Sequence, residues 1–326
     1  MSDSLKKSLR GIGIAVGIPV AAFVIVKLIA PDLVRLSQFK SMLIQAIFPA
    51  ILAWGVMCEL KSGIWDFSVG ANVLICEIIG GNLAKSLGLG VPGVIFFSAV
   101  IGTLIGYLIG KIFIMAKIPS IIVSVGAMLL LESLSCILYE GNGIRFGPSI
   151  LIMSTAPYNV IFGIVCALIA WLLYTKRPFG FHVRLIGSSI NIARQNGIDI
   201  DKTRIKIFMM TGLFCGFYGV MELGSSGVVT SKSNMASMGI IFSAIICVFI
   251  AMTIEKWVNL VVGIYVGAVV ASIIRLTILV TGGSNAFQQV IMASILIIVF
   301  AVQNNLPKKK KKRRKGSLIQ AERSKT

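Results

Sequence analysis

Long, nearly uninterrupted apolar segments are the feature that most restricts the fold of this sequence. A helix that crosses the hydrocarbon core of a bilayer needs about 20 consecutive apolar residues. The segments that approach this length lie at residues 11–29, 42–57, 67–84, 91–110, 118–138, 160–174, 207–223, 238–254, 257–280 and 287–302. Because hydrocarbon offers the backbone no hydrogen-bond partner, such segments cross it as helices. We therefore predict an all-α fold, that of a polytopic membrane protein with about ten transmembrane helices.

The composition favours a membrane protein over a soluble one. Of the 326 residues, 56% are hydrophobic and 13% are charged, whereas soluble proteins carry about 25% charged residues. The 6 cysteines lie in or next to apolar segments and show no C-x-x-C spacing. This pattern favours buried thiols over a disulfide framework or a zinc site. We expect neither a metal nor another cofactor.

The distribution of basic residues predicts the orientation in the membrane. With the amino terminus in the cytoplasm, an even number of spans returns the carboxyl terminus to the same side. Of the 31 lysines and arginines, this assignment leaves on the outer side only Lys27, Arg35, Lys40, Lys85, Arg145, Lys232 and Arg275. Cytoplasmic loops carry such an excess of basic residues. We expect a cytoplasmic amino terminus (1–10), a transmembrane domain (11–303) and a polybasic cytoplasmic tail (304–326).

The tail contains the basic run PKKKKKRRKG, at residues 307–316, and the chain has a net charge of +19. In a soluble protein this charge would indicate a nucleic acid partner, but here it follows the membrane topology. Two interpretations of the tail stay open: a disordered segment that fixes the topology, and a segment that binds anionic lipid headgroups. We expect membrane lipid and no nucleic acid as a partner.

The longest cytoplasmic loop, residues 175–206, contains the signals of a short helix. Serine favours the N-cap position and glycine the C-terminal stop. The candidate residues are Ser188, Ser189, Ile190, Ala193, Arg194 and Gly197. Either serine can be the N-cap, and Ile190 and Ala193 should share one side of the helix. The loop is either a plain connection with one helical turn or, since long ordered loops are usually functional, a site that docks a soluble motor.

Several motifs follow one another along the chain. They are D-F-S-V-G at 66–70, K-I-P-S at 117–120, V-S-V-G at 123–126, F-G at 179–180, I-G at 186–187, A-R at 193–194 and G-I at 197–198. In this order they resemble the permease subunit of ribose-type ABC importers. That family also handles xylose, arabinose and galactose, and it belongs to the branched-chain amino acid and monosaccharide permease superfamily. The resemblance covers roughly residues 42–303.

The resemblance implies a type II ABC importer-like permease in a bacterial cytoplasmic membrane. Its partners would be an ABC ATP-binding subunit, an extracytoplasmic solute-binding protein and a second permease copy. The loop motifs would couple the permease to the ATPase. The chain differs from the family at residues 251–257, AMTIEKW, where the family usually has a glycine-rich G-G-T-S…G-G turn. Pairing with the same chain and pairing with a paralogue therefore both stay open.

An acidic residue, Glu77, lies in the middle of the apolar segment 67–84. It shares a helical face with Gly70 and Gly80, and small residues let another helix approach closely. A carboxyl at mid-bilayer costs several kcal/mol unless it is paired, hydrated or protonated. Together with Asn72, Glu77 is therefore a candidate contact of the translocation path. The other interpretation is that it hydrogen-bonds neighbouring helices and rigidifies the bundle.

Other polar residues and glycines of the spans predict structural roles. Asp66 stands before the segment 67–84, where its carboxylate can cap exposed amides at the positive end of a helix. Glu132 and Glu222 are expected to bond to neighbouring helices. Glycines spaced by four residues predict close helix packing, and they occur as Gly13–Gly17, Gly102–Gly106–Gly110, Gly212–Gly216 and Gly263–Gly267.

The sequence favours a transport subunit over an enzyme. Its single histidine, His182, lies in the cytoplasmic loop, and the chain contains neither an H-E-x-x-H motif nor an ATP-binding fold. We predict a pore subunit for a small polar solute, in first place a monosaccharide, that is powered by a separate ATPase. The alternatives are an ion-coupled secondary transporter, an ABC permease for nucleosides or branched-chain amino acids, and a membrane scaffold without transport.

Overall fold

The computed structural model describes residues 3–29 and 36–280 and the isolated positions 290, 291, 294, 297 and 301. Most of the predicted span 287–302 and all of the tail 304–326 lie outside the described residues. The α-helices are α1 (Asp3–Ile29), α2 (Leu36–Gln45), α3 (Ile47–Ser62), α4 (Val69–Ser86), α5 (Gly90–Ala116), α6 (Ser120–Ile137), α7 (Tyr158–Trp171), α8 (Pro178–Ser188), α9 (Ile190–Gln195), α10 (Ile200–Ser226), α11 (Met238–Ile254) and α12 (Leu260–Val280). Short helical turns are η1 (Leu138–Gly141), η2 (Pro148–Ser154) and η3 (Leu172–Lys176), and the strands β1 (Ile144–Arg145) and β2 (Val228–Val229) pair antiparallel.

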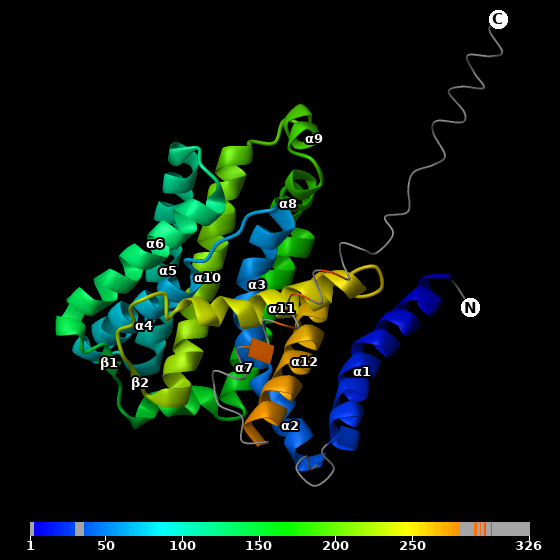
Figure 1. The fold of residues 1–326 in the computed structure, drawn as a ribbon, viewed down its shortest axis with the longest axis horizontal. Coiled ribbons are helices and arrows are strands. Elements are labelled where there is room, and N and C mark those ends of the chain that lie inside the picture. Colours follow the sequence, from blue (N-terminus) through cyan, green and yellow to red (C-terminus); the bar gives the residue numbers. More distant parts are fainter. Residues whose placement is uncertain are drawn as a thin grey trace, which may run out of the picture.

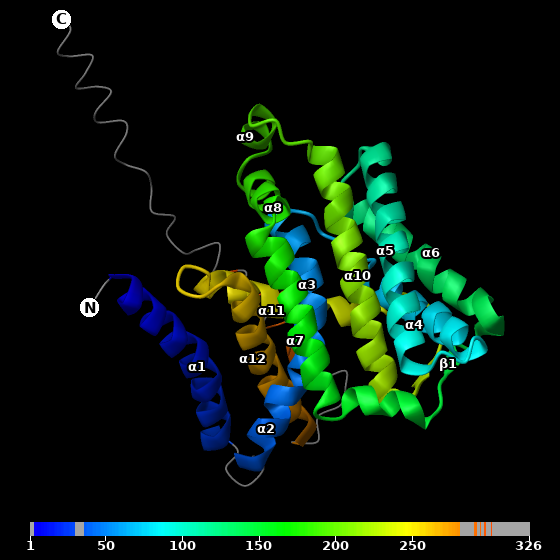
Figure 2. The same ribbon diagram turned by 180° about the vertical axis from the view of Figure 1, so that it is seen from behind.

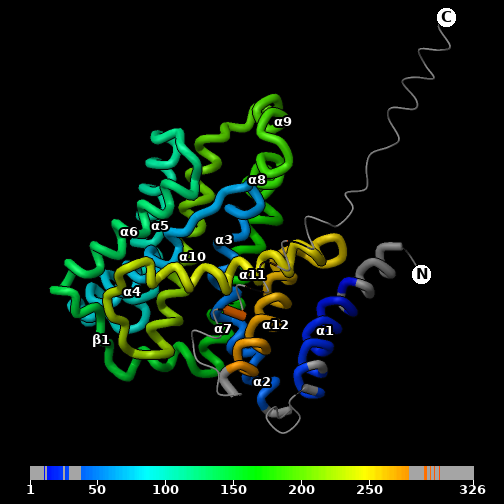
Figure 3. Tube along the Cα trace, viewed as in Figure 1, coloured from blue at the N-terminus to red at the C-terminus, as the bar shows by residue number. Residues whose placement is uncertain are grey.

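The helices form one bundle with two distinct ends. Helices α3, α7, α10 and α12 run in similar directions, whereas α11 crosses them (Figures 1 and 2). Helices α8 and α9 project from one end, and β1 and β2 lie toward the other (Figures 1 and 3). This arrangement separates the motif-bearing loop from the short strand pair.

The predicted apolar segments that fall within the described residues all overlap helices, which confirms the all-α polytopic fold. Six helices of the described residues are long and apolar enough to cross a membrane: Gln38–Lys61, Gly90–Ala116, Ser120–Gly141, Tyr158–Lys176, Ile200–Ser226 and Leu260–Ile278. Shorter apolar helices are Gly13–Leu28 and Met238–Ile254. The predicted span 42–57 runs from α2 into α3 through Ala46, which keeps a helical backbone. The N–H groups of Ala46 and Ala50 still donate to carbonyls four residues back, whereas Pro49 has no N–H to donate to the carbonyl of Gln45.

Glycines bring α5 and α10 into backbone contact. A Cβ added at Gly102 would overlap the carbonyl oxygen of Gly212, and one at Gly106 would overlap that of Phe208. Gly267 likewise lets α12 approach α11. These contacts confirm the packing predicted from the glycine spacing in α5, α10 and α12.

The glycine prediction is wrong for α1. A Cβ built at Gly13 or at Gly17 would find nothing within 4 Å. The close contact of this helix is instead made by Gly11, where a Cβ would lie 2.6 Å from the carbonyl oxygen of Trp257. The spacing of two glycines identifies a helix face without side chains, but it does not show whether another helix packs against that face.

Apolar side chains cover the outside of the bundle as well as its core. Leu104 of α5, Leu130 of α6 and Ile164 of α7 are 56%, 71% and 62% exposed. A large apolar surface of this kind is a liability in water, whereas it is what a helix requires where it faces lipid. The core lies among α3, α4, α10 and α11, whose side chains are mostly buried.

Candidate functional site

The predicted short helix is present as α9, and its N-cap is Ser189. The Ser189 side chain accepts a hydrogen bond from the N–H of Ile192 at 3.4 Å. At the other end Gly197 has φ +74°, and its N–H and that of Ile198 donate back to carbonyls of α9. This pair of bonds is the Schellman pattern, which favours glycine at the left-handed position. The predicted start and stop of the helix are confirmed.

Ile190 and Ala193 share one side of α9 by their spacing, as expected, but the two side chains differ in burial. Ala193 is fully buried, whereas Ile190 is 41% exposed. Three residues turn a helix through about 300°, which leaves the two side chains about 60° apart, and the turn at Gly197 folds the chain back onto Ala193 alone. The small core around Ala193 contains Ile186, Ile198 and Ile200. The exposed surface of α9 and its flanks includes Ser188, Ile190, Ile192, Arg194 and Gly197.

Two glycines seat α8 directly on the backbone of the bundle. A Cβ added at Gly180 would overlap the carbonyl oxygen of Tyr174, and one at Gly187 would overlap that of Lys61. Arg184 adds a hydrogen bond from its Nη1 to the Tyr174 carbonyl at 3.2 Å. These contacts give the F-G and I-G motifs a structural reason, since any larger residue would push α8 away.

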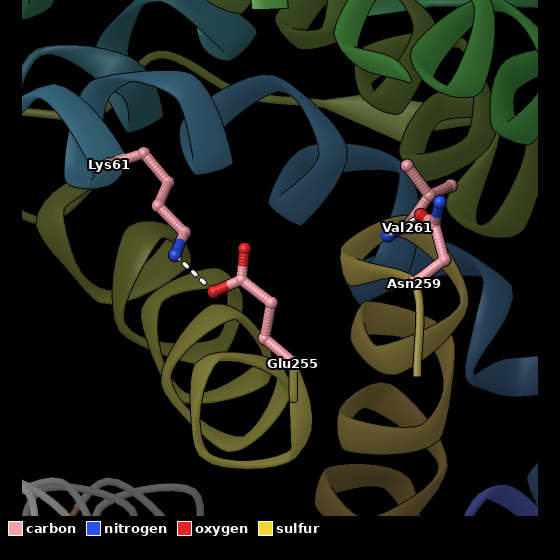
Figure 4. Close-up of polar contacts among 4 residues, drawn as sticks. All are labelled: Lys61, Glu255, Asn259 and Val261. Carbon is pink, nitrogen blue, oxygen red and sulfur yellow. Dashed lines mark hydrogen bonds and ion pairs between the residues drawn. The ribbon is translucent and has the colours of Figure 1, made fainter. Parts of the chain in front are cut away.

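The segment where the chain differs from the family pattern, residues 251–257, forms the last turn of α11 and the start of the turn that leads to α12. Glu255 in this turn forms an ion pair with Lys61 at the end of α3 (Figure 4). Asn259 caps α12 by accepting a hydrogen bond from the N–H of Val261 at 3.0 Å. Trp54 of α3 donates its indole N–H to the Val261 carbonyl at 2.9 Å. The ion pair was not predicted, because its partners are 194 residues apart.

Asp66 has a different role from the predicted one. Its Oδ1 accepts hydrogen bonds from the N–H of Ser68 at 2.8 Å and from the Ser68 hydroxyl at 2.5 Å. Ser68 is the residue before α4, and its own side chain makes no capping bond to that helix. The carboxylate therefore orders the turn that leads into α4, as aspartate does in Asx turns, and does not cap the helix itself.

The candidate path residues Glu77 and Asn72 are buried in α4. Glu77 is 1% exposed, and its Oε1 has no hydrogen-bond partner among the described residues. A Cβ at Gly219 of α10 would lie 2.9 Å from Cγ of Glu77, so this glycine makes room for the acidic side chain. The Oδ1 of Asn72 accepts a weak bond from the Cys76 thiol, 3.4 Å away. The two residues share one buried helix, and their contact with a solute stays a prediction.

Glu132 holds the beginning of α11. Its Oε2 accepts the N–H of Met235, and its Oε1 accepts the N–H and hydroxyl of Ser237, at 2.8, 2.8 and 2.5 Å. The prediction that Glu132 bonds to a neighbouring element is confirmed. Glu222 differs, because its Oε2 has no partner among the described residues.

Glu59 was missed by the sequence analysis. It lies in the last turns of α3, it is fully buried, and neither carboxyl oxygen has a hydrogen-bond partner among the described residues. Such groups are usually satisfied in folded proteins. The sequence contains a signal for this residue, since an acidic residue two positions after the apolar segment 42–57 is a candidate for burial at the end of a span.

Outside the spans, Asp199 is the N-cap of α10. It accepts the N–H of Lys202 at 3.0 Å, and this bond is the main reason why the pKa of Asp199 lies below its usual value. Among the residues that the structure describes, no group of three or more His, Cys, Asp or Glu side chains is placed to hold a metal ion.

Comparison with known proteins assigns the chain to a family. A family model described as branched-chain amino acid transport system / permease component matches residues 38–300. The galactose/methyl galactoside import permease protein MglC of Haemophilus influenzae is 24% identical over 290 residues, 82% of this chain and 86% of that protein, and the Escherichia coli protein of the same name is 21% identical over the same shares. The autoinducer 2 import system permease protein LsrC of Yersinia pestis is 25% identical over 219 residues, 65% of this chain and 62% of that protein. No solved structure matches the chain. Because the family model spans most of its length, the chain belongs to the branched-chain amino acid transport system / permease component family and is a multi-pass membrane transport subunit.

Proposed function

We propose that this permease imports a monosaccharide-type solute and that a separate ATP-binding subunit drives it. The relatives described above carry the names of import permeases for galactose or methyl galactoside and for autoinducer 2. The observation that carries the proposal is the α8–α9 segment (residues 178–199), a short capped helix on a rigid base that projects from one end of the bundle (Figure 1).

The ATP-binding subunit docks on the exposed surface of α9. Ile190 and Ile192 are 41% and 48% exposed there, and Arg194 adds a positive charge. Ala193 and Gly197 do not contact the subunit. Buried Ala193 holds α9 in place, and Gly197 ends the helix. A soluble partner that covers the two isoleucines removes apolar surface from water, at about 25 cal/mol for each Å² buried.

The topology follows from the charge distribution. The amino terminus (1–10), the α8–α9 segment and the tail (304–326) lie in the cytoplasm, and the transmembrane domain covers residues 11–303. The solute-binding protein docks at the opposite end, near β1 and β2. The polybasic tail lies close to anionic lipid headgroups.

Asn72 and Glu77 supply polar contacts near the solute path. A monosaccharide offers hydroxyl donors, and Oε1 of Glu77 is a buried acceptor that has no partner among the described residues. The pore is completed by a second permease copy, either this chain or a paralogue.

The buried Oε1 of Glu77, which has no hydrogen-bond partner among the described residues, also favours a second candidate function. This candidate is an ion-coupled transporter that uses the carboxyl of Glu77 as its ion site. Purification of the tagged permease from its native membrane distinguishes the two. We expect an ATP-binding subunit to co-purify and uptake into proteoliposomes to require ATP. Uptake by the permease alone, driven by an imposed ion gradient, would establish the second candidate.

A further inference from the structure

The turn between α11 and α12, residues 255–259, is tied to the base of the α8–α9 segment at two places. Glu255 forms the ion pair with Lys61, and their side chains are 33% and 20% exposed. Figure 4 shows the two side chains reaching toward each other from different helices. A pair that is partly shielded from water is screened less than one on the open surface. The turn therefore has a specific, directional contact with the end of α3.

The first connection to α8 runs through the backbone of Lys61. The carbonyl oxygen of this residue is the one on which Gly187 rests, with no space for a Cβ between them. The residue that holds Glu255 by its side chain thus supports α8 by its main chain. A displacement of α8 along or across α3 moves Lys61 and, through the ion pair, the turn.

The second connection runs through Asn259. Its Nδ2 donates to the hydroxyl of Thr175, 3.4 Å away, while its Oδ1 caps α12. Thr175 follows Tyr174, whose carbonyl oxygen accepts the hydrogen bond from Arg184 of α8. The same helix, α8, is therefore linked to the turn by two separate chains of contacts, one through Lys61 and one through Thr175 and Tyr174.

Helix α11 continues from this turn into the interior of the bundle. Phe249 of α11 stacks on Trp65, with ring centroids 6.2 Å apart, and Trp65 precedes the Asp66 turn into α4. At its other end α11 is held by Glu132. In Figure 1, α11 runs across α3 from the end near the α11–α12 turn toward α4. A movement received at the turn is thus carried toward the helix that contains Glu77.

We infer that Lys61 and Glu255 are positioning residues that transmit movement of the α8–α9 segment to α11 and α12. The ion pair makes the turn follow α8, so that a motor docked on α9 reorients the interior of the permease. The inference rests on the proposed function, since it requires an ATP-binding subunit on α9. It goes further by naming the contact through which the movement passes.

The functional test uses charge reversal in the complete reconstituted transporter. The variants are Lys61→Glu, Glu255→Lys and the double exchange, and the readout is solute taken up per ATP hydrolysed. Each single reversal places like charges together and should lower this ratio by about fivefold or more, while basal hydrolysis continues. The double exchange should restore the ratio to within about twofold of wild type. Lys256→Glu is the matched control, since Lys256 is an exposed lysine in the same turn, and it should leave the ratio unchanged.

A second measurement needs no ATP-binding subunit. Amide hydrogen exchange of the permease alone in lipid nanodiscs should become faster in both the turn and the α8–α9 segment in each single reversal, and return to normal in the double exchange. Single reversals that leave the uptake ratio at the wild-type value, a double exchange as impaired as the single ones, or faster exchange confined to the turn would each overturn the inference. If the wild-type permease binds no ATP-binding subunit, the proposed function fails, while the exchange result still decides whether the contact exists.

Discussion

At the scale of single residues, Glu77 distinguishes ATP-driven import from ion-coupled transport. Glu77→Gln keeps the shape and hydrogen-bonding capacity and removes the charge, so ATP-dependent uptake should persist with at most a modest change in rate. Glu77→Leu adds a branch at Cγ. This atom already packs against Gly219 so closely that a Cβ added at Gly219 would lie 2.9 Å from it. Overpacking of this kind costs about 1–3 kcal/mol, and uptake should fall. Uptake assays of both variants in proteoliposomes check the expectation.

The opposite result at this residue would be equally informative. If uptake follows an imposed proton or sodium gradient without ATP, and disappears in Glu77→Gln, the carboxyl binds a coupling ion. Glu132→Gln is not a suitable control, because Glu132 holds the start of α11 with both oxygens. Lys85→Gln on the exposed end of α4 is suitable, and it should not change the ATP requirement.

At the scale of elements, α9 should respond differently to a charge at a buried position and to a charge at an exposed position. Ala193→Glu would force a carboxylate into the core with Ile186 and Ile198, which is costly because buried charges without partners are strongly unfavourable. We expect limited proteolysis to cut the α8–α9 segment of this variant rapidly. Ile190→Glu places the same charge at an exposed position, so the segment should stay folded while binding of the ATP-binding subunit weakens by about tenfold. Equal binding by Ile190→Glu and wild type would contradict docking on the exposed surface of α9.

The crossing of α5 and α10 offers a second test at this scale. Gly106→Ala puts a Cβ against the backbone of Phe208, and we expect it to destabilise the bundle by about 1–3 kcal/mol. Gly13→Ala is the matched control, because a Cβ there meets nothing within 4 Å. Thermal unfolding of the two variants in detergent should show a lower Tm for Gly106→Ala alone, and an equal Tm for both would refute the close approach.

These elements also show which parts of the structure the sequence could predict. The apolar segments predicted helices, because a backbone in lipid has few other ways to satisfy its hydrogen bonds. Ser189 and Gly197 predicted the ends of α9, because caps act within a few residues. The burial of Ala193 and the pairing of Lys61 with Glu255 depend on how distant segments meet in space, and no local pattern carries that information.

At the scale of the whole molecule, the remaining prediction concerns orientation. The α8–α9 segment and the β1–β2 pair lie toward opposite ends of the bundle (Figures 1 and 3), and the basic residues favour a cytoplasmic α8–α9 segment. Arg194→Cys and Arg145→Cys provide matched probes, because both arginines are exposed, one at each end.

The probes are read in a Cys136→Ser background, since Cys136 is exposed while the other cysteines are buried. A membrane-impermeant maleimide added to intact cells should label Arg145→Cys, and it should label Arg194→Cys only after the cells are permeabilised. The physical reason is that moving the basic α8–α9 segment outward would reverse the excess of Lys and Arg on the cytoplasmic side. Labelling of Arg194→Cys from outside intact cells would place α9 beyond the reach of a cytoplasmic ATPase and would refute the proposed coupling.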